Sequence, residues 1–175
     1  MAKWLDQVAD VCLLRSGPQD LPYSYALLEI CVLAYGLSGL GALLLGFGAQ
    51  RWFGALILTL IDMGLIAGFS YAMLSHLGQI NRWVQTLTAL FGVGALLQVA
   101  SLPLTAWQAQ ALDEKGDPSL PWLLSQGLAV WSIMVNGHIL QQAFSTSRGI
   151  GVAYALGYFF LLLVIGELIL PPLSP

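Results

Sequence analysis

Charge is what this sequence has least of. Only 9% of its 175 residues are Asp, Glu, Lys or Arg, whereas soluble domains carry about 25%. So few charges cannot build a surface that faces water, and 58% of the residues are hydrophobic. The composition therefore indicates a polytopic membrane protein with a single domain in the lipid bilayer. The net charge of −3 includes no basic cluster, so the sequence predicts no nucleic-acid partner.

Cysteines and catalytic motifs are also scarce. Cys12 and Cys31 have no metal-ligand spacing, and we expect two small buried thiols without a disulfide. No Ser or Cys stands in a motif with His and a carboxylate, as nucleophilic catalysis would need. We therefore expect neither an enzyme nor a bound cofactor or metal. Asp6 and Asp10 interrupt the apolar core that a signal peptide would require at this N-terminus.

Long apolar runs are abundant. A helix that spans a bilayer needs about 20 predominantly apolar residues. Five stretches qualify: residues 25–47, 53–74, 84–107, 120–143 and 150–170. Short connections make sequential helices antiparallel neighbours, so the predicted fold is all-α, a compact bundle of five transmembrane helices in a domain over residues 25–175. Tryptophans at the ends of these stretches, where their rings favour the headgroup layer, support the boundaries: Trp52, Trp83, Trp107 and Trp122.

The first 24 residues form a separate segment with a different pattern. Apolar side chains recur at helical spacing along one face of it: Trp4, Leu5, Val8, Val11 and Cys12. The stripe is too short to span a membrane, so it predicts an amphipathic helix that lies at the cytoplasmic interface. A helix that docks a partner is the alternative interpretation.

The positive charges favour one orientation. With a cytoplasmic N-terminus, four of the six Lys and Arg residues lie on the cytoplasmic side: Lys3, Arg15, Arg82 and Arg148. Arg51 and Lys115 lie on the other side. Since cytoplasmic loops carry an excess of Lys and Arg, the count predicts N-in and C-out.

Small residues recur every fourth position in three of the predicted spans. The ladders are Ala34-Ser38-Ala42-Gly46, Gly64-Gly68 and Gly149-Ala153-Gly157. Helices associate in lipid where small residues let their backbones approach. Packing inside the bundle is the favoured interpretation, and a second copy or a foreign subunit is the alternative.

Asp62 is the exception in the apolar run "LILTLIDMGLIAGFSYAML". It lies about ten residues from either end of the second span, where a carboxylate costs about 2.5–3.5 kcal/mol on insertion scales. We therefore expect it to face the bundle and find partners there, or to carry a proton. By depth, the candidates for one polar core with Asp62 are Tyr35, Ser38, Gln98, Gln126, Asn136 and His138.

Two interpretations of this core stay open. One is a proton or cation binding site built on Asp62 and supported by Gln98, Asn136 and His138. The other is a polar clasp that fixes the register of the helices. The sequence favours the clasp, because Asp62 has no basic residue at its depth.

The stretch "LAVWSIMVNGHILQQAFSTSRGIGVAYALGYFFLLLV", residues 128–164, resembles the last helix pair of Yip1-domain proteins. A Trp-containing helix is followed by the link Ser147-Arg148-Gly149 and a helix rich in small residues, and Gly17-Pro18 precedes the first span. The tail of about 24 residues resembles the short-tailed bacterial members. The resemblance implies a multi-pass protein of the cell's inner (plasma) membrane with no defined reaction, and no GTPase-binding tail of the eukaryotic kind.

Two function hypotheses follow. The first is a non-enzymatic integral membrane protein that acts as a scaffold or accessory subunit of a membrane complex, or in membrane organisation. Its partners would be the lipid bilayer and other membrane protein subunits, or further copies of the chain. The alternative is a small proton- or ion-coupled transporter or channel-like protein that uses Asp62.

Overall fold

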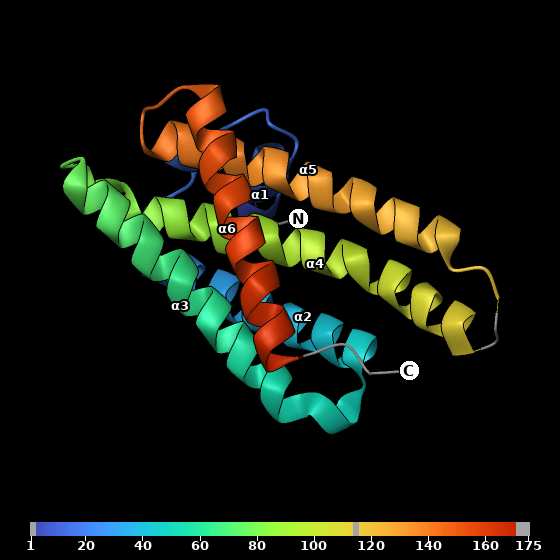
Figure 1. The fold of residues 1–175 in the computed structure, drawn as a ribbon. Coiled ribbons are helices and arrows are strands. Elements are labelled where there is room, and N and C mark those ends of the chain that lie inside the picture. Colours follow the sequence, from blue (N-terminus) through green and yellow to red (C-terminus); the bar gives the residue numbers. More distant parts are fainter. Residues whose placement is uncertain (1–2, 114–115, 171–175) are drawn as a thin grey trace.

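The computed structural model describes residues 3–113 and 116–170, and this part of the chain is predominantly helical, with no strand. Five of its helices are long and apolar enough to cross a membrane, which confirms that expectation. They are α2 (Tyr25–Phe47), α3 (Trp52–His76), α4 (Trp83–Asp113), α5 (Ser119–Ala143) and α6 (Arg148–Ile169) (Figure 1). The helix α1 (Lys3–Cys12) precedes them, and three short 3₁₀ turns are η1 (Pro18–Asp20), η2 (Ala49–Arg51) and η3 (Ile80–Arg82).

The helix α4 lies at the centre of the molecule. It packs against α1, α2, α3 and α5, and half of its most apolar window is buried, against 22% or less in the other long helices. It continues six residues beyond the predicted end at Trp107, to Asp113. Together with the first half of α5 it extends past the other helices (Figure 1).

The helix α6 is the least covered. It contacts α5 and α3, and only 6% of its most apolar window is buried. Figure 1 shows it running at a steep angle to α2, α4 and α5, from the end of α5 toward the start of α3. It therefore bridges two helices across α4 rather than lying alongside one of them.

The helix α1 packs against α4 and α5. Val8 and Val11, on its apolar stripe, are 2% and 0% exposed. Gly92 of α4 makes room for this contact, because a Cβ there would lie 3.1 Å from Val8 Cγ1. The amphipathic pattern thus predicted the helix correctly, but neighbouring helices cover part of the stripe that we expected to face lipid.

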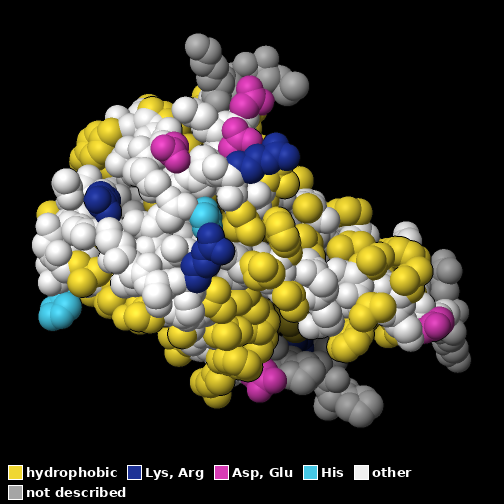
Figure 2. Space-filling view, turned by 90° about the horizontal axis from the view of Figure 1, so that it is seen from above, with side chains coloured by type: hydrophobic (Ala, Val, Ile, Leu, Met, Phe, Trp, Pro, Cys, Tyr) yellow, Lys and Arg dark blue, Asp and Glu magenta, His cyan; other side chains and the backbone are white. Residues whose placement is uncertain are grey.

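Three connections meet at one end of the molecule. Arg82 Nη1 donates to Ser145 Oγ over 3.0 Å, and Gln85 Nε2 donates to the Leu21 carbonyl over 2.7 Å. These bonds bring the segments 13–24, 77–82 and 144–147 together around the start of α4, and we call these three segments the N-terminal end. In Figure 2 the large basic side chains and the histidines lie over the left and centre of the visible face, and none is seen on the extension at the right. Lys115, counted on the opposite side, lies outside the described residues.

The helices α5 and α6 cross at two glycines. A Cβ on Gly151 would lie 2.3 Å from the Gly137 carbonyl oxygen, and a Cβ on Gly137 would lie 2.9 Å from Val152 Cα. Separations this short exclude a side chain at either position. The closest approach of α6 therefore uses Gly151, which stands between the rungs of the predicted ladder.

Two of the predicted small-residue ladders face away from the protein. Gly64 and Gly68 in α3, and Gly149 and Gly157 in α6, have no atom within 4 Å of an added Cβ among the described neighbours. The favoured prediction of internal packing is wrong for these two ladders. The α2 ladder is partly used, since a Cβ on Gly46 would lie 3.6 Å from the side chain of Thr105 in α4.

Candidate functional site

Asp62 holds three helices together through two tyrosines. Tyr35 of α2 donates its hydroxyl to Asp62 Oδ2 over 2.5 Å. Tyr158 of α6 donates to Asp62 Oδ1 and approaches the Asp62 backbone carbonyl to 3.0 Å. Each carboxylate oxygen thus accepts from a different neighbouring helix. We call these three residues the Asp62 clasp.

A second pair of polar residues lies beside the clasp. Ser38 Oγ donates to Gln98 Oε1 over 2.6 Å and lies 3.2 Å from the Tyr35 carbonyl oxygen. Gly39, which is buried, leaves room for the Gln98 amide, because an added Cβ would lie 3.0 Å from Nε2. The polar residues of α2 therefore reach both α3 and α4.

Two cavities lie on either side of this polar layer. The larger, which we call the central cavity, measures about 230 Å³ and is lined by all five long helices, with Tyr35 and Tyr158 in its wall. The other measures about 210 Å³ and is lined by Asp62 and Thr59. Gln98 and Leu162 border both. The Asp62 clasp thus stands between two partly open cavities.

The clasp surrounds Asp62 with neutral donors. A buried carboxylate requires compensating hydrogen bonds or a proton, and the two tyrosine hydroxyls supply one bond to each of its oxygens. Such a group can fix the positions of α2, α3 and α6, and it can also take up and release a proton. The geometry is compatible with both interpretations that the sequence left open.

The structure brings only part of the predicted site together. Gln98 and Asn136 both line the central cavity. Gln126, the remaining candidate on α5, is exposed. Asn136, which matched Asp62 best in depth, makes no hydrogen bond with it. Within the described part of the chain, the Asn136 carboxamide has no hydrogen-bond partner at all.

His138 belongs to a different place. Its Nε2 lies 3.2 Å from the Ser16 carbonyl oxygen and 2.7 Å from Gln142 Nε2. It lines a separate cavity at the N-terminal end, together with Arg148. The structure therefore does not place His138 beside Asp62: its contacts tie the segment after α1 to α5.

Tyr158 is the functional residue that the sequence analysis missed. It lies in the middle of the last apolar run, where a tyrosine hydroxyl needs a hydrogen-bond partner. This requirement could have pointed to a hydrogen bond between Tyr158 and Asp62, because Asp62 is the buried group that most needs a donor. What the sequence could not supply was the rotation of α6 that points Tyr158 toward α3.

Other chemistry is sparse in the described residues. No group of three His, Cys, Asp or Glu side chains there could hold a metal ion. Cys12 and Cys31 are free thiols. Burial raises the pKa of the Cys12 thiol, and a hydrogen bond to Trp131 partly opposes this shift.

The chain was compared with known protein families, curated proteins and solved structures. No family model matches the chain, and no curated protein or solved structure matches it.

Proposed function

We propose that this chain is a non-enzymatic integral membrane protein that serves as a scaffold or accessory subunit of a membrane complex. The observation that carries the proposal is the outward direction of two small-residue ladders, Gly64-Gly68 and Gly149-Ala153-Gly157. Small residues on a lipid-facing surface gain nothing from lipid, but they let another helix approach closely. Together we call these two ladders the docking ladders.

The neighbouring side chains support such a surface. Leu60 precedes Gly64 by one turn and is 58% exposed, and Phe160 follows Gly157 by three residues and is 61% exposed. Each ladder therefore places small residues next to a large exposed apolar side chain, an arrangement that lets another helix approach. Because α6 has so little cover of its own, we infer that the occupant is a transmembrane helix of another membrane protein.

The proposed placement follows from the charges. Arg15, Arg82 and Arg148 lie in or next to the three segments of the N-terminal end. An excess of Lys and Arg favours the cytoplasmic side, which supports N-in and C-out for a five-helix bundle. The resemblance to short-tailed bacterial Yip1-domain proteins supports the inner membrane as its location.

Substitutions in a docking ladder should release the partner. We expect Gly64→Leu with Gly68→Leu to remove co-purifying subunits after gentle detergent extraction, because the new side chains block close approach. The control is Leu37→Ala, which removes bulk from an α2 side chain that is 71% exposed. The measurement is migration on blue-native gels with mass spectrometry of the bound chains. Migration of the unaltered protein only as a free monomer would contradict the proposal.

Proton-coupled transport is the second candidate, and one observation favours it. The Asp62 clasp stands between two cavities, so a proton on Asp62 would lie between them. If the chain conducts protons by this route, purified protein in liposomes should dissipate a pH gradient, and Asp62→Asn should abolish the flux. A flux that Asp62→Asn leaves unchanged would remove Asp62 from the mechanism.

A further inference from the structure

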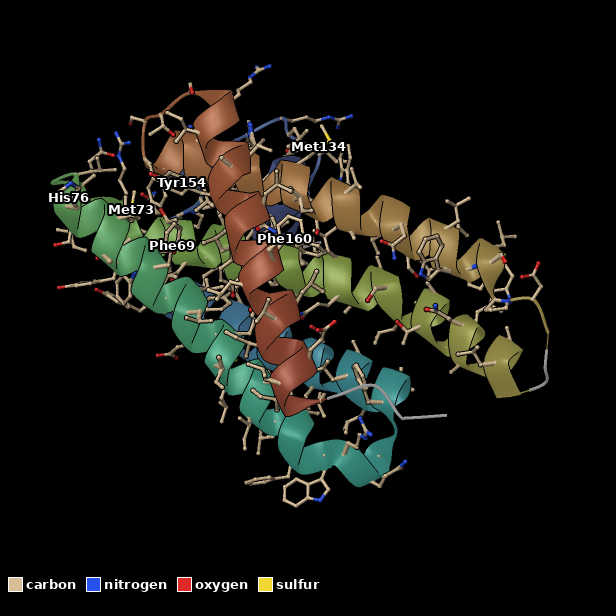
Figure 3. All side chains as sticks on the ribbon, in the orientation of Figure 1. Phe69, Met73, His76, Met134, Tyr154 and Phe160 are labelled. Atoms are coloured by element: carbon tan, nitrogen blue, oxygen red, sulfur yellow. The ribbon has the colours of Figure 1, made fainter. Side chains whose placement is uncertain are left out.

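The central cavity has the features of a binding site rather than a packing defect. All five long helices contribute to its wall, so its shape depends on the whole fold. Figure 3 shows Phe69 of α3 and Tyr154 of α6 lying between their two helices. Their ring centroids are 5.7 Å apart, and Phe144 completes a set of three rings. Phe69 also lines the cavity.

The wall offers hydrogen bonds that the protein does not use. Asn136 projects a carboxamide with no partner among the described residues. The Oε1 atom of Gln98 accepts a hydrogen bond from Ser38. The two N–H donors of the same amide remain available to a ligand. Both residues are half-buried, so a ligand that accepts from these amides would gain hydrogen bonds in a site shielded from most of the surroundings.

These two amides stand at different depths. The bond between Arg82 and Ser145 places the start of α4 and the end of α5 at a similar depth. Asn136 precedes Ser145 by nine residues, and Gln98 follows Arg82 by sixteen. At about 1.5 Å per residue, Gln98 lies roughly 10 Å farther from the N-terminal end than Asn136. Between them the wall is mainly apolar, with Leu90, Ile133 and Phe159.

The lining also limits the charge and size of a ligand. No Asp, Glu, Lys, Arg or His is among the described residues of the wall, and an uncompensated charge there would be costly. An apolar cavity of about 150 Å³ takes up benzene. A cavity of about 230 Å³ therefore has room for one substituted ring.

We propose that the central cavity binds an uncharged, lipid-soluble ring compound with a carbonyl acceptor at each end, of the quinone type. One carbonyl accepts from the Asn136 amide and the other from the Gln98 amide. A six-membered ring with a hydrogen bond of about 2.9 Å at each carbonyl bridges the span between the two residues. This inference is independent of the docking ladders, and either can fail without the other.

The test uses duroquinone as the probe and durene, the same methylated ring without carbonyls, as its control. The full chain in nanodiscs is dialysed against each compound, and the bound amount is measured by chromatography. We expect the protein to retain duroquinone well above empty nanodiscs, at close to one molecule per chain. Durene should be retained no better than by empty nanodiscs.

Two leucine variants locate the site. Asn136→Leu should weaken duroquinone binding roughly tenfold or more, since one carbonyl loses its donor. It should not lower the melting temperature, because the Asn136 carboxamide makes no hydrogen bond within the described part of the chain. Gln126→Leu, an exposed amide on the same helix, should bind like the unaltered chain. Equal retention of durene and duroquinone, or duroquinone binding that Asn136→Leu does not weaken, would overturn the proposal.

Discussion

Adding one methyl group at Gly151 should destabilise the protein, whereas the same change at Gly157 should not. Alanine normally stabilises a helix relative to glycine, by about 0.5–1 kcal/mol. At Gly151 the new Cβ would lie 2.3 Å from the Gly137 carbonyl oxygen and 3.0 Å from the Gln141 amide nitrogen. These are backbone atoms that cannot rotate away, so α6 must move off α5.

The expected cost of Gly151→Ala is about 3 kcal/mol, at the upper end of the range for overpacked sites. Gly157→Ala is the matched control, since it lies on the same helix with no described atom within 4 Å of an added Cβ. Thermal unfolding of both variants in detergent, followed by size-exclusion chromatography, measures the difference. Equal melting temperatures would show that the two helices do not cross at Gly137 and Gly151.

Asp62→Leu should cost about 2–4 kcal/mol of folding stability. The substitution deprives two tyrosine hydroxyls of their carboxylate acceptors, and each buried unsatisfied group costs about 1–3 kcal/mol. Tyr158 keeps a nearby acceptor in the backbone carbonyl of residue 62, 3.0 Å away. Most of the loss should therefore fall on Tyr35, which has no such alternative among the described contacts.

The substitution Asp62→Asn distinguishes a structural role of Asp62 from a role as a proton binding site. An asparagine keeps a carbonyl oxygen for one of the two tyrosines, so a clasp should lose only about 1 kcal/mol. A double-mutant cycle of Asp62→Leu, which removes both carboxylate acceptors, with Tyr35→Phe measures the coupling between Tyr35 and Asp62. Chemical denaturation in mixed micelles supplies the free energies of unfolding. Additive effects of the two substitutions would contradict the hydrogen bond between them.

The five long helices could be predicted from the sequence because length and apolar composition dictate them. The first, over residues 25–47, coincides with α2, and the others differ mainly at their ends. The largest difference is at α4, where Gln108 and Gln110 lie in a final helical stretch, residues 108–113, that is more polar than the rest. Hydropathy marks the apolar part of a helix and gives no signal for a polar extension of it.

The rotations of the helices could not be predicted. Gly149, Gly151, Ala153, Ala155 and Gly157 are all small, so sequence alone could not show which side of α6 meets α5. The structure chooses Gly151 and Ala155, which are buried, and turns the other three outward. The same missing rotation explains why Tyr158 was overlooked as a partner of Asp62.

The depths of the polar residues along the spans were predicted more successfully than their hydrogen-bond partners. Asp62, Tyr35, Ser38 and Gln98 do lie close together, as their positions along the spans suggested. His138 was assigned to the same core although it lies nearer the N-terminal end, where the segment after α1 supplies its partner. A short N-terminal segment that folds back into the helices cannot be placed from periodicity alone.

Photo-crosslinking in intact membranes tests the central claim most directly. A photoreactive residue is placed at Leu60 or Phe160, beside the docking ladders, and at Leu37 on α2 as the control. We predict that the first two positions capture a distinct membrane protein in high yield, whereas Leu37 captures mainly lipid. If neither Leu60 nor Phe160 captures protein above the level seen at Leu37, the chain is not a subunit that docks through these ladders.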